Sequence, residues 1–453
     1  MNKNEPTQTH LNALTKFRQQ AYALFANQRA VLFELTDAII QTPAAGSFAE
    51  LSLARACTRQ WPSLYCALAD GALDLEGLRT LCLQQVPREK ARRHFALDVM
   101  AVRRMHSPTL QERVFCHGAQ REVGGQGVII GLPYSLLAYV EERGNSWAPA
   151  VHTQRIKPGQ SAVEVALTQV RWLAVKLPAD NPPEIALDGG YGNRKFFAGL
   201  RGVRGFATAR LRNDRVLYQL PLALPSGAKR PPGRPPKYGP EFRFAEPATW
   251  PAPDEVCEFA DPQYGRVRLE LWAALRFRVK QELVDIAVLR SQIHLEQAKP
   301  PAPHWYGVHN GTSEKTTARR VFECLTHRWP IEPANRFRKE RLYAELPKVR
   351  TAASSDLWLQ LVQLVEWELY LWRPAAADVH LPWQAPLPPA HLTPGRVIRS
   401  LGANLARIGT PVVAALPRGK SPGWPAGRHR TRPPRYRLES KRRKKALEMS
   451  KNE

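Results

Sequence analysis

The chain has 453 residues, which is too long for one ordinary hydrophobic core and predicts two or three domains. Its 66 Lys and Arg residues outnumber 40 acids, giving a formal net charge of +26, and such an excess predicts a polyanionic partner, nucleic acid first. No apolar run reaches the roughly 18 residues of a membrane span, and the first residues lack the apolar core of a signal peptide. We therefore expect a cytoplasmic, nucleoid-associated protein without a membrane partner. Six scattered cysteines without a C-x-x-C pair predict reduced thiols rather than a zinc site.

Residues 1–90 are expected to form an N-terminal helical domain. Apolar residues recur there at helical spacing, as in Val31-Leu32 with Leu35 and in Leu64 with Leu68. A DNA-binding domain fits this pattern, and so does a plain helical cap or a dimerisation bundle, because no groove-reading signature is present.

Strand signals begin near His94 and continue through the apolar run 128–131. A helix is predicted from about 162 to 177, where apolar residues fall on one side, and a further strand at 206–211. Three early strands, a helix and later strands predict an α/β protein. Residues 91–212 would form the first part of an RNase H-like core, a mixed sheet with helices on both faces.

The pattern returns to β in residues 213–312, which we interpret as a β-rich insertion subdomain with a Pro-rich loop at 225–240. Helical residues 313–375 would complete the RNase H-like core. Proline and arginine dominate the basic C-terminal region, residues 376–453. Between 418 and 445 there are twelve Lys or Arg residues and one acid, a net charge of +11, which is typical of an arm that is disordered without a polyanionic partner.

Three carboxylates stand out as candidate metal ligands. Asp98 and Asp188 each end an apolar, strand-like run, which predicts that both lie at the carboxyl end of a buried strand. Glu332 follows Pro330 by two residues, so a helix that starts near this proline would carry Glu332 in its first turn. Three carboxylates suit a pair of Mg²⁺ ions that activate a nucleophile and a leaving oxygen. Each aspartate alone would also fit a strand-end turn.

The ordered set of Asp98, Asp188 and the spacing Arg328-Glu332-Lys339 resembles DDE transposases of bacterial insertion sequences. The similar group carries a tyrosine-arginine-glutamate-lysine signature and a β-rich insertion in its catalytic domain. The resemblance runs from about residue 50 to about residue 430. It implies Mg²⁺-dependent strand cleavage and strand transfer at terminal inverted repeats, with Mn²⁺ able to replace Mg²⁺. It also implies double-stranded DNA as partner and a homodimer in a synaptic complex.

By this resemblance, Arg328 and Lys339 hold DNA phosphates beside the cut, whereas Leu325 stands at the tyrosine position and cannot donate a hydrogen bond. Trp305 stands where related transposases stack a tryptophan on an extruded base, although a core tryptophan fits equally well. Residues 229–237 resemble an AT-hook, although an ordinary charged loop without a DNA contact would have a similar composition. The DNA-binding residues that we expect are Arg328, Lys339, Trp305, Arg210, Arg212, Arg230, Arg234, Lys237, Arg442 and Arg443.

Two functions remain in contention. One is an active transposase, and the other is a decayed or co-opted DNA-binding protein that uses its basic segments alone. Retention of all three carboxylates favours the enzyme. A stand-alone RNase H-like nuclease is disfavoured by the inserted subdomain and the basic C-terminal region.

Overall fold

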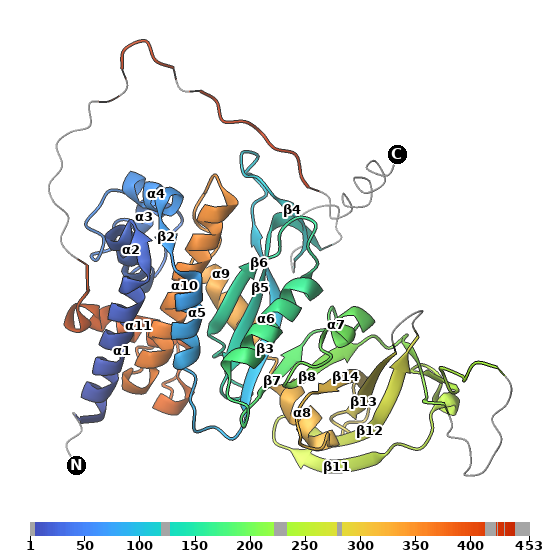
Figure 1. Ribbon diagram of the computed structural model, residues 1–453. Coiled ribbons are helices and arrows are strands. Elements are labelled where there is room, and N and C mark those ends of the chain that lie inside the picture. Colours follow the sequence, from blue (N-terminus) through green and yellow to red (C-terminus); the bar gives the residue numbers. More distant parts are fainter. Residues whose placement is uncertain are drawn as a thin grey trace, which may run out of the picture.

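The computed structural model describes residues 5–118, 127–221, 233–278, 283–412, 423, 425–429 and 431–439. Figure 1 shows three parts side by side: a helical body that contains both early and late helices, a central sheet, and a β-rich part that continues the sheet on the far side. Among the described helices, none is long and apolar enough to cross a membrane.

The middle of the sheet consists of five strands in the order β6-β5-β3-β7-β8. β5 runs antiparallel to both of its neighbours, β6 and β3, and β7 and β8 run parallel to β3. This mixed sheet is consistent with the RNase H-like core that the sequence predicts. The strands are β3 (Arg93–Arg103), β5 (Val128–Val140), β6 (Ala150–Arg155), β7 (Pro183–Leu187) and β8 (Phe206–Leu211), and β4 (Val114–His117) pairs with the start of β5.

One face of the sheet is covered by α6 (Ala162–Lys176) and α7 (Arg194–Gly199), which lie in front of the strands in Figure 1. α6 begins with a capping box, in which the Ser161 hydroxyl and the Glu164 carboxylate each accept a hydrogen bond from the other's backbone N–H. Its buried Gln169 donates to the backbone oxygen of Ser135 at 3.1 Å, which fixes α6 against β5.

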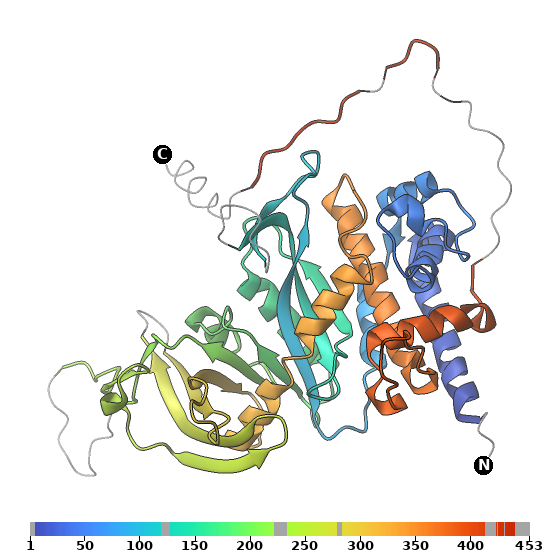
Figure 2. The same ribbon diagram turned by 180° about the vertical axis from the view of Figure 1, so that it is seen from behind.

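The opposite face carries α8 (Ala318–Thr326) and α9 (Ile331–Glu340), the orange helices in front of the strands in Figure 2. Ile331 and Ala334 of α9 form a small buried cluster with Ala96 of β3 and Ala138 of β5. The two helices are separate because Pro330, the N-cap of α9, cannot continue a helix from before. The sequence-based prediction of a new helix near Pro330 is thus confirmed.

The β-rich part extends the same sheet, because β14 pairs antiparallel with β8. Its core is a group of aromatic rings, Phe242, Phe244, Trp250, Trp272 and Trp305, with centroids 4.2–6.1 Å apart. Such rings bury large apolar areas and so stabilise the insertion. The strands are β9 (Val216–Tyr218), β10 (Glu241–Arg243), β11 (Glu255–Asp261), β12 (Gly265–Phe277), β13 (Val284–Gln292) and β14 (His304–Asn310).

The helical body joins early and late segments of the chain, as the blue and orange-red helices of Figure 1 show. One of its helices, α11, lies in the region that the sequence reading treated as a Pro- and Arg-rich segment. α11 forms because Val397, Leu401 and Leu405 recur at helical spacing and are buried against the body. The helices are α1 (Glu5–Ala23), α2 (Arg29–Gln41), α3 (Phe48–Leu51), α4 (Trp61–Asp70), α5 (Leu75–Gln84), α10 (Ala352–Trp372) and α11 (Pro394–Ile408), and β1 (Phe25–Asn27) pairs with β2 (Ala72–Leu73).

The helical body is fixed to the sheet by side chains of α10 that bond the backbone of β6. Gln360 donates to the oxygen of Thr153 at 3.2 Å, Gln363 donates to that of Val151 at 3.1 Å, and Trp367 donates to that of Ala150 at 2.7 Å. Within the described residues β6 pairs with β5 alone, so its outer edge would otherwise present unpaired backbone groups. These side chains satisfy that edge.

A buried ion-pair network holds the helices of the body together. Arg18 of α1 pairs with Asp37 of α2 at 2.8 Å and with Glu368 of α10, and it donates to the oxygen of Gly409 after α11 at 3.3 Å. The Arg18 side chain is only 1 % exposed, so each carboxylate depends on it for compensation. A buried charge that loses its partner costs far more than the pair itself contributes.

We predict that Arg18→Leu lowers the free energy of unfolding by about 3–5 kcal/mol, because it leaves two carboxylates buried without a cation. Urea denaturation measures the change. The matched control is Arg407→Leu on exposed α11 surface, which should change stability by less than about 0.5 kcal/mol. Equal effects of the two substitutions would contradict the role assigned to Arg18.

Candidate active site

The register of two parallel strands brings the first two candidate acids together. Leu97 of β3 is paired with Leu187 of β7, so the next residues, Asp98 and Asp188, are neighbours at the same level of the sheet. Side chains alternate along a strand, and Asp98 lies two residues after Ala96, which packs against α9. Both aspartates therefore lie on the face that carries α8 and α9.

The third acid reaches the same place from α9. Glu332 is in the first turn of that helix, and its negative charge influences the Asp98 carboxyl, as does that of Asp188. Arg328, just before the helix, forms an ion pair with Glu332. The three carboxylates that the sequence singled out thus lie near enough for their charges to interact, with one cation beside them. Their ligand atoms do not form as tight a group as those of His94, Glu184 and Cys324.

The carboxyl of Asp98 is affected by its burial and by the charges around it. Burial raises its pKa to about 6 from an ordinary 3.8; the Arg328 charge opposes this shift, and the charges of Asp188 and Glu332 add to it. Its Oδ1 accepts a hydrogen bond from the backbone N–H of Val99 at 2.8 Å. Carboxylates of like charge on one side of a sheet suit a hard divalent cation, because the cation would offset both their repulsion and the cost of burial.

Asp188 sits in a tight glycine-containing turn at the end of β7. Its Oδ1 accepts a hydrogen bond from the backbone N–H of Gly190 at 2.9 Å. A Cβ at Gly192 would lie 2.0 Å from the backbone oxygen of Arg210, so only glycine lets the turn pass this close to β8. The turn fixes the position of Asp188, which lines a cleft.

That cleft has a volume of about 870 Å³ and lies beside the acids, between the end of the sheet and the helix pair α8–α9. It is lined by Asp188 and Glu332, and cationic and aromatic side chains surround them. Its further lining includes Arg210, Arg212, Arg328, Tyr264, His304, Tyr306, Leu325 and Trp329. The arrangement can hold an anionic polymer next to a group of oxygen ligands.

Of the two cations predicted beside the cut, Arg328 lines this cleft, and Arg210 and Arg212 from the wider set of predicted DNA-binding residues line it too. Arg210 is exposed with its Nη2 3.2 Å from Nδ1 of His304, and Arg212 lies 3.4 Å from Asp214 at the surface. Lys339 lies two turns after Glu332 along α9 and is not among the residues that line the cleft.

The stacking role predicted for Trp305 needs correction. Trp305 and Tyr306 are adjacent on β14, so they point to opposite faces of the sheet. Tyr306 lines the cleft, whereas Trp305 is 2 % exposed and stacks on Phe244 at 4.2 Å inside the insertion. Trp305 is therefore a core residue, which was the other alternative that the sequence allowed.

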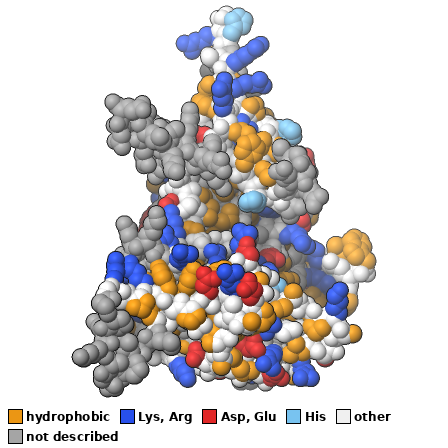
Figure 3. All heavy atoms as spheres, turned by 90° about the vertical axis from the view of Figure 1, so that its right-hand side faces the viewer, with side chains coloured by type: hydrophobic (Ala, Val, Ile, Leu, Met, Phe, Trp, Pro, Cys, Tyr) orange, Lys and Arg blue, Asp and Glu red, His pale blue; other side chains and the backbone are white. Residues whose placement is uncertain are grey.

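The remaining predicted DNA contacts are distributed over other segments. Arg234 is exposed and Lys237 is partly buried, both in the connection between β9 and β10 and outside the cleft lining. Arg230, Arg442 and Arg443 lie outside the described residues. Figure 3 shows the side of the molecule that is on the right in Figure 1. Basic side chains lie along the segment that projects from the top of this view, and basic and acidic side chains are intermixed over its lower half.

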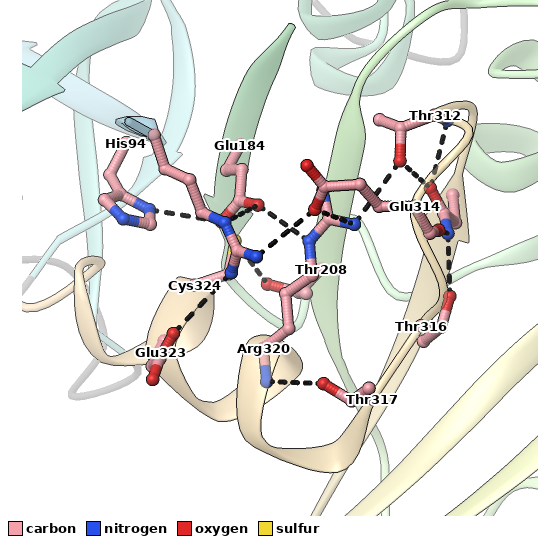
Figure 4. Close-up of polar contacts among 12 residues, drawn as sticks. His94, Glu184, Thr208, Thr312, Glu314, Thr316, Thr317, Arg320, Glu323 and Cys324 are labelled. Atoms are coloured by element: carbon pink, nitrogen blue, oxygen red, sulfur yellow. Dashed lines mark hydrogen bonds and ion pairs between the residues drawn. The ribbon is translucent and has the colours of Figure 1, made fainter. Parts of the chain in front are cut away.

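A second polar cluster lies on the same face of the sheet, four residues before each aspartate (Figure 4). Ligand atoms of His94, Glu184 and Cys324 come within 4.8 Å of one another, as no other His, Cys and acid group does in the described part of the chain. Arg320 already pairs with Glu184 at 2.8 Å, and Arg92 is 3.7 Å from the same carboxylate. Two guanidinium groups would repel a dication. We interpret the cluster as an ion-pair network that fixes α8 to β7.

Sequence reasoning missed several residues that contact the site. Asn335 donates a hydrogen bond to Asp98 at 3.2 Å, and the buried Tyr191 lies close enough to both aspartates that their charges contribute to raising its pKa, after burial. Tyr306 places a phenol in the cleft that Leu325 also lines. The helical spacing of Asn335 after Glu332 could have identified it, because residues three apart lie on one side of a helix. Tyr306 could be found only once the insertion was known to extend the sheet.

The chain belongs to the family described as DDE superfamily endonucleases, whose pattern matches residues 21–273. The matched segment covers more than half of the chain and includes Asp98 and Asp188, whereas Glu332 lies beyond its end. No curated protein matches the sequence significantly. Membership supports a nuclease-type enzyme with a DNA substrate, and nucleases of this superfamily generally use divalent metal ions.

We predict that Asp98→Asn stabilises the metal-free protein at pH 8 by up to about 3 kcal/mol. The raised pKa of Asp98, about 6, means that the folded state holds this proton more tightly than the unfolded state does. Stability is therefore lost as the pH rises from about 4 to about 6, and asparagine avoids that loss. Thermal melting in EDTA at pH 8 and pH 4.5 should show a gain at pH 8 that shrinks on acidification. An equal gain at both pH values would contradict the prediction.

Proposed function

We propose that this protein is a DNA transposase that binds terminal inverted repeats and catalyses strand cleavage and strand transfer. Asp98, Asp188 and Glu332 would hold two Mg²⁺ ions, with Mn²⁺ as a substitute. The observation that carries the proposal is the convergence of these three acids from β3, β7 and α9 beside a cleft with cationic walls. Its relation to the insertion-sequence group rests on the Arg328-Glu332-Lys339 spacing.

The oxygen-only set of three carboxylates fits Mg²⁺, which prefers such ligands and keeps several waters. Divalent ions at such a site activate the attacking oxygen and stabilise the leaving oxygen. Arg328 neutralises Glu332 in the absence of a ligand, and in the complex its guanidinium is free to contact a backbone phosphate instead. Arg210 and Arg212 would contact phosphates farther along the cleft.

Leu325 cannot supply the hydroxyl of the signature tyrosine. His327 is no substitute, because it stacks on His94 at 3.7 Å and its Nδ1 bonds the oxygen of Glu323. Tyr306 is placed better, since it lines the cleft and lies near enough to Arg210 and Arg328 for their charges to affect its pKa. We therefore assign the phosphate contact to Tyr306 within this proposal.

Asp98→Ala, Asp188→Ala and Glu332→Ala should each reduce nicking of a transposon-end duplex by about 10³-fold or more, because each removes a ligand for ions worth several kcal/mol to the transition state. Gel-based cleavage assays measure nicking, and fluorescence anisotropy measures binding of the same duplex, which should persist.

Glu340→Ala is the matched control, because Glu340 is exposed at the end of the same helix. Normal cleavage by Glu332→Ala together with lost cleavage by Glu340→Ala would refute the choice of the third acid. A protein that binds the ends but never cuts, with or without its acids, would instead be the co-opted DNA-binding relative.

Deleting residues 418–453 should weaken DNA binding and flatten its salt dependence while nicking persists at low salt. The segment 418–445 has a net charge of +11, and each phosphate neutralised contributes roughly −0.9 to the slope of log K against log salt. Because only some of its cations engage at once, we expect a loss of about four to eight units of slope. Binding titrations between 50 and about 200 mM salt measure it, and an unchanged slope would mean that this segment does not touch DNA.

A further inference from the structure

Asn335 stands out on α9 because it touches a candidate metal ligand and yet is absent from the signature. It lies one turn after Glu332, on the side of the helix that faces β3. Its Nδ2 donates to Oδ2 of Asp98 at 3.2 Å, while Oδ1 of Asp98 accepts from the backbone of Val99. Both carboxylate oxygens of Asp98 thus accept a hydrogen bond from the protein.

The amide of Asn335 can have only one orientation. Nη1 of Arg338 lies 2.7 Å from Oδ1 of Asn335, and a guanidinium is exclusively a hydrogen-bond donor. The atom that faces Arg338 must therefore be the amide oxygen, which turns the NH₂ group toward Asp98. Arg338 therefore orients the Asn335 amide so that its NH₂ group donates to Asp98.

Arg338 is itself firmly anchored. It is 1 % exposed, its Nη2 donates to the backbone oxygen of Ala148 at 2.5 Å, and its Nε forms an ion pair with Glu366 of α10 at 2.8 Å. The other oxygen of Glu366 accepts from the backbone N–H of Ala150 at 3.3 Å. A continuous series of contacts thus leads from β6, through α10 and α9, to the Asp98 carboxylate.

We propose that Asn335 is a positioning residue for Asp98, and that Arg338 and Glu366 hold it in place. The proposal rests on the proposed function, in which Asp98 binds a divalent cation. A carboxylate that is free to rotate loses part of its affinity for a metal. Residues that hydrogen-bond a metal-binding side chain and fix its orientation typically contribute 10–100-fold to metal affinity. A simple packing contact between α9 and β3 would make no such contribution.

The test measures Mn²⁺ binding to the full chain without DNA. In each titration, the electron paramagnetic resonance signal reports the concentration of free Mn²⁺. Asn335→Leu keeps the branched shape of the side chain and removes the donor. The matched control is Asn404→Leu on α11, because Asn404 likewise accepts from an arginine three residues later, Arg407, at 3.2 Å. Asp98→Ala reports on the metal site itself. Arg338 is left intact, because its loss would bury an unpaired Glu366.

We expect Asn335→Leu to weaken Mn²⁺ binding by about 10–100-fold, with a metal-free melting temperature within about 2 °C of that of the wild type. Asn404→Leu should bind Mn²⁺ normally. Unchanged Mn²⁺ affinity in Asn335→Leu, while Asp98→Ala has lost binding, would overturn the positioning role and leave the metal site intact. Normal Mn²⁺ binding by Asp98→Ala would instead overturn the proposed metal site.

Discussion

The pairing of Leu97 with Leu187 is the constraint on which the site depends. Because β3 and β7 are parallel neighbours in this register, the two residues that follow are adjacent and face the same side. A slip of one residue in either strand would turn its aspartate to the face that carries α6 and α7. The buried apolar residues around the pair therefore determine chemistry as well as stability, since they fix the register that brings the acids together.

The position of the third acid, Glu332, depends on the break between α8 and α9. α8 ends at Thr326 and α9 begins at Ile331, directly after Pro330, so the two helices are oriented separately on the same face. α8 is fixed at the start of the strands by the Glu184–Arg320 pair, and α9 is fixed near their ends by Ile331 and Ala334. A single straight helix could not satisfy both attachments. The interruption lets Glu332 enter the site while α8 remains packed on β7.

Sequence patterns predicted the parts of this arrangement that are local. The apolar runs before Asp98 and Asp188 indicated strands, and Pro330 indicated a helix start, because both signals lie within a few residues of their consequence. The predicted position of Asp98 at the end of its strand was wrong, because β3 continues to Arg103, whereas Asp188 does follow the last residue of β7. Trp305 was harder, because its side of the sheet depends on how β14 pairs with β8. Helical spacing could place Asn335 on the same side of α9 as Glu332, but its contact with Asp98, 237 residues away, could not be predicted. The helix α11 was masked by flanking prolines, although its apolar spacing was visible in the sequence.

The ion-pair network around Arg18 has a consequence for how the protein is made. Glu368, its partner, lies 350 residues later in the chain. At roughly 5–20 residues per second, a ribosome needs about 20–70 s to synthesise the segment between them. During this time Arg18 lacks Glu368, one of its two counter-charges, and Glu332 is synthesised close to the end of the interval. The helical body and the third candidate acid are thus completed almost together, once most of the chain has been synthesised.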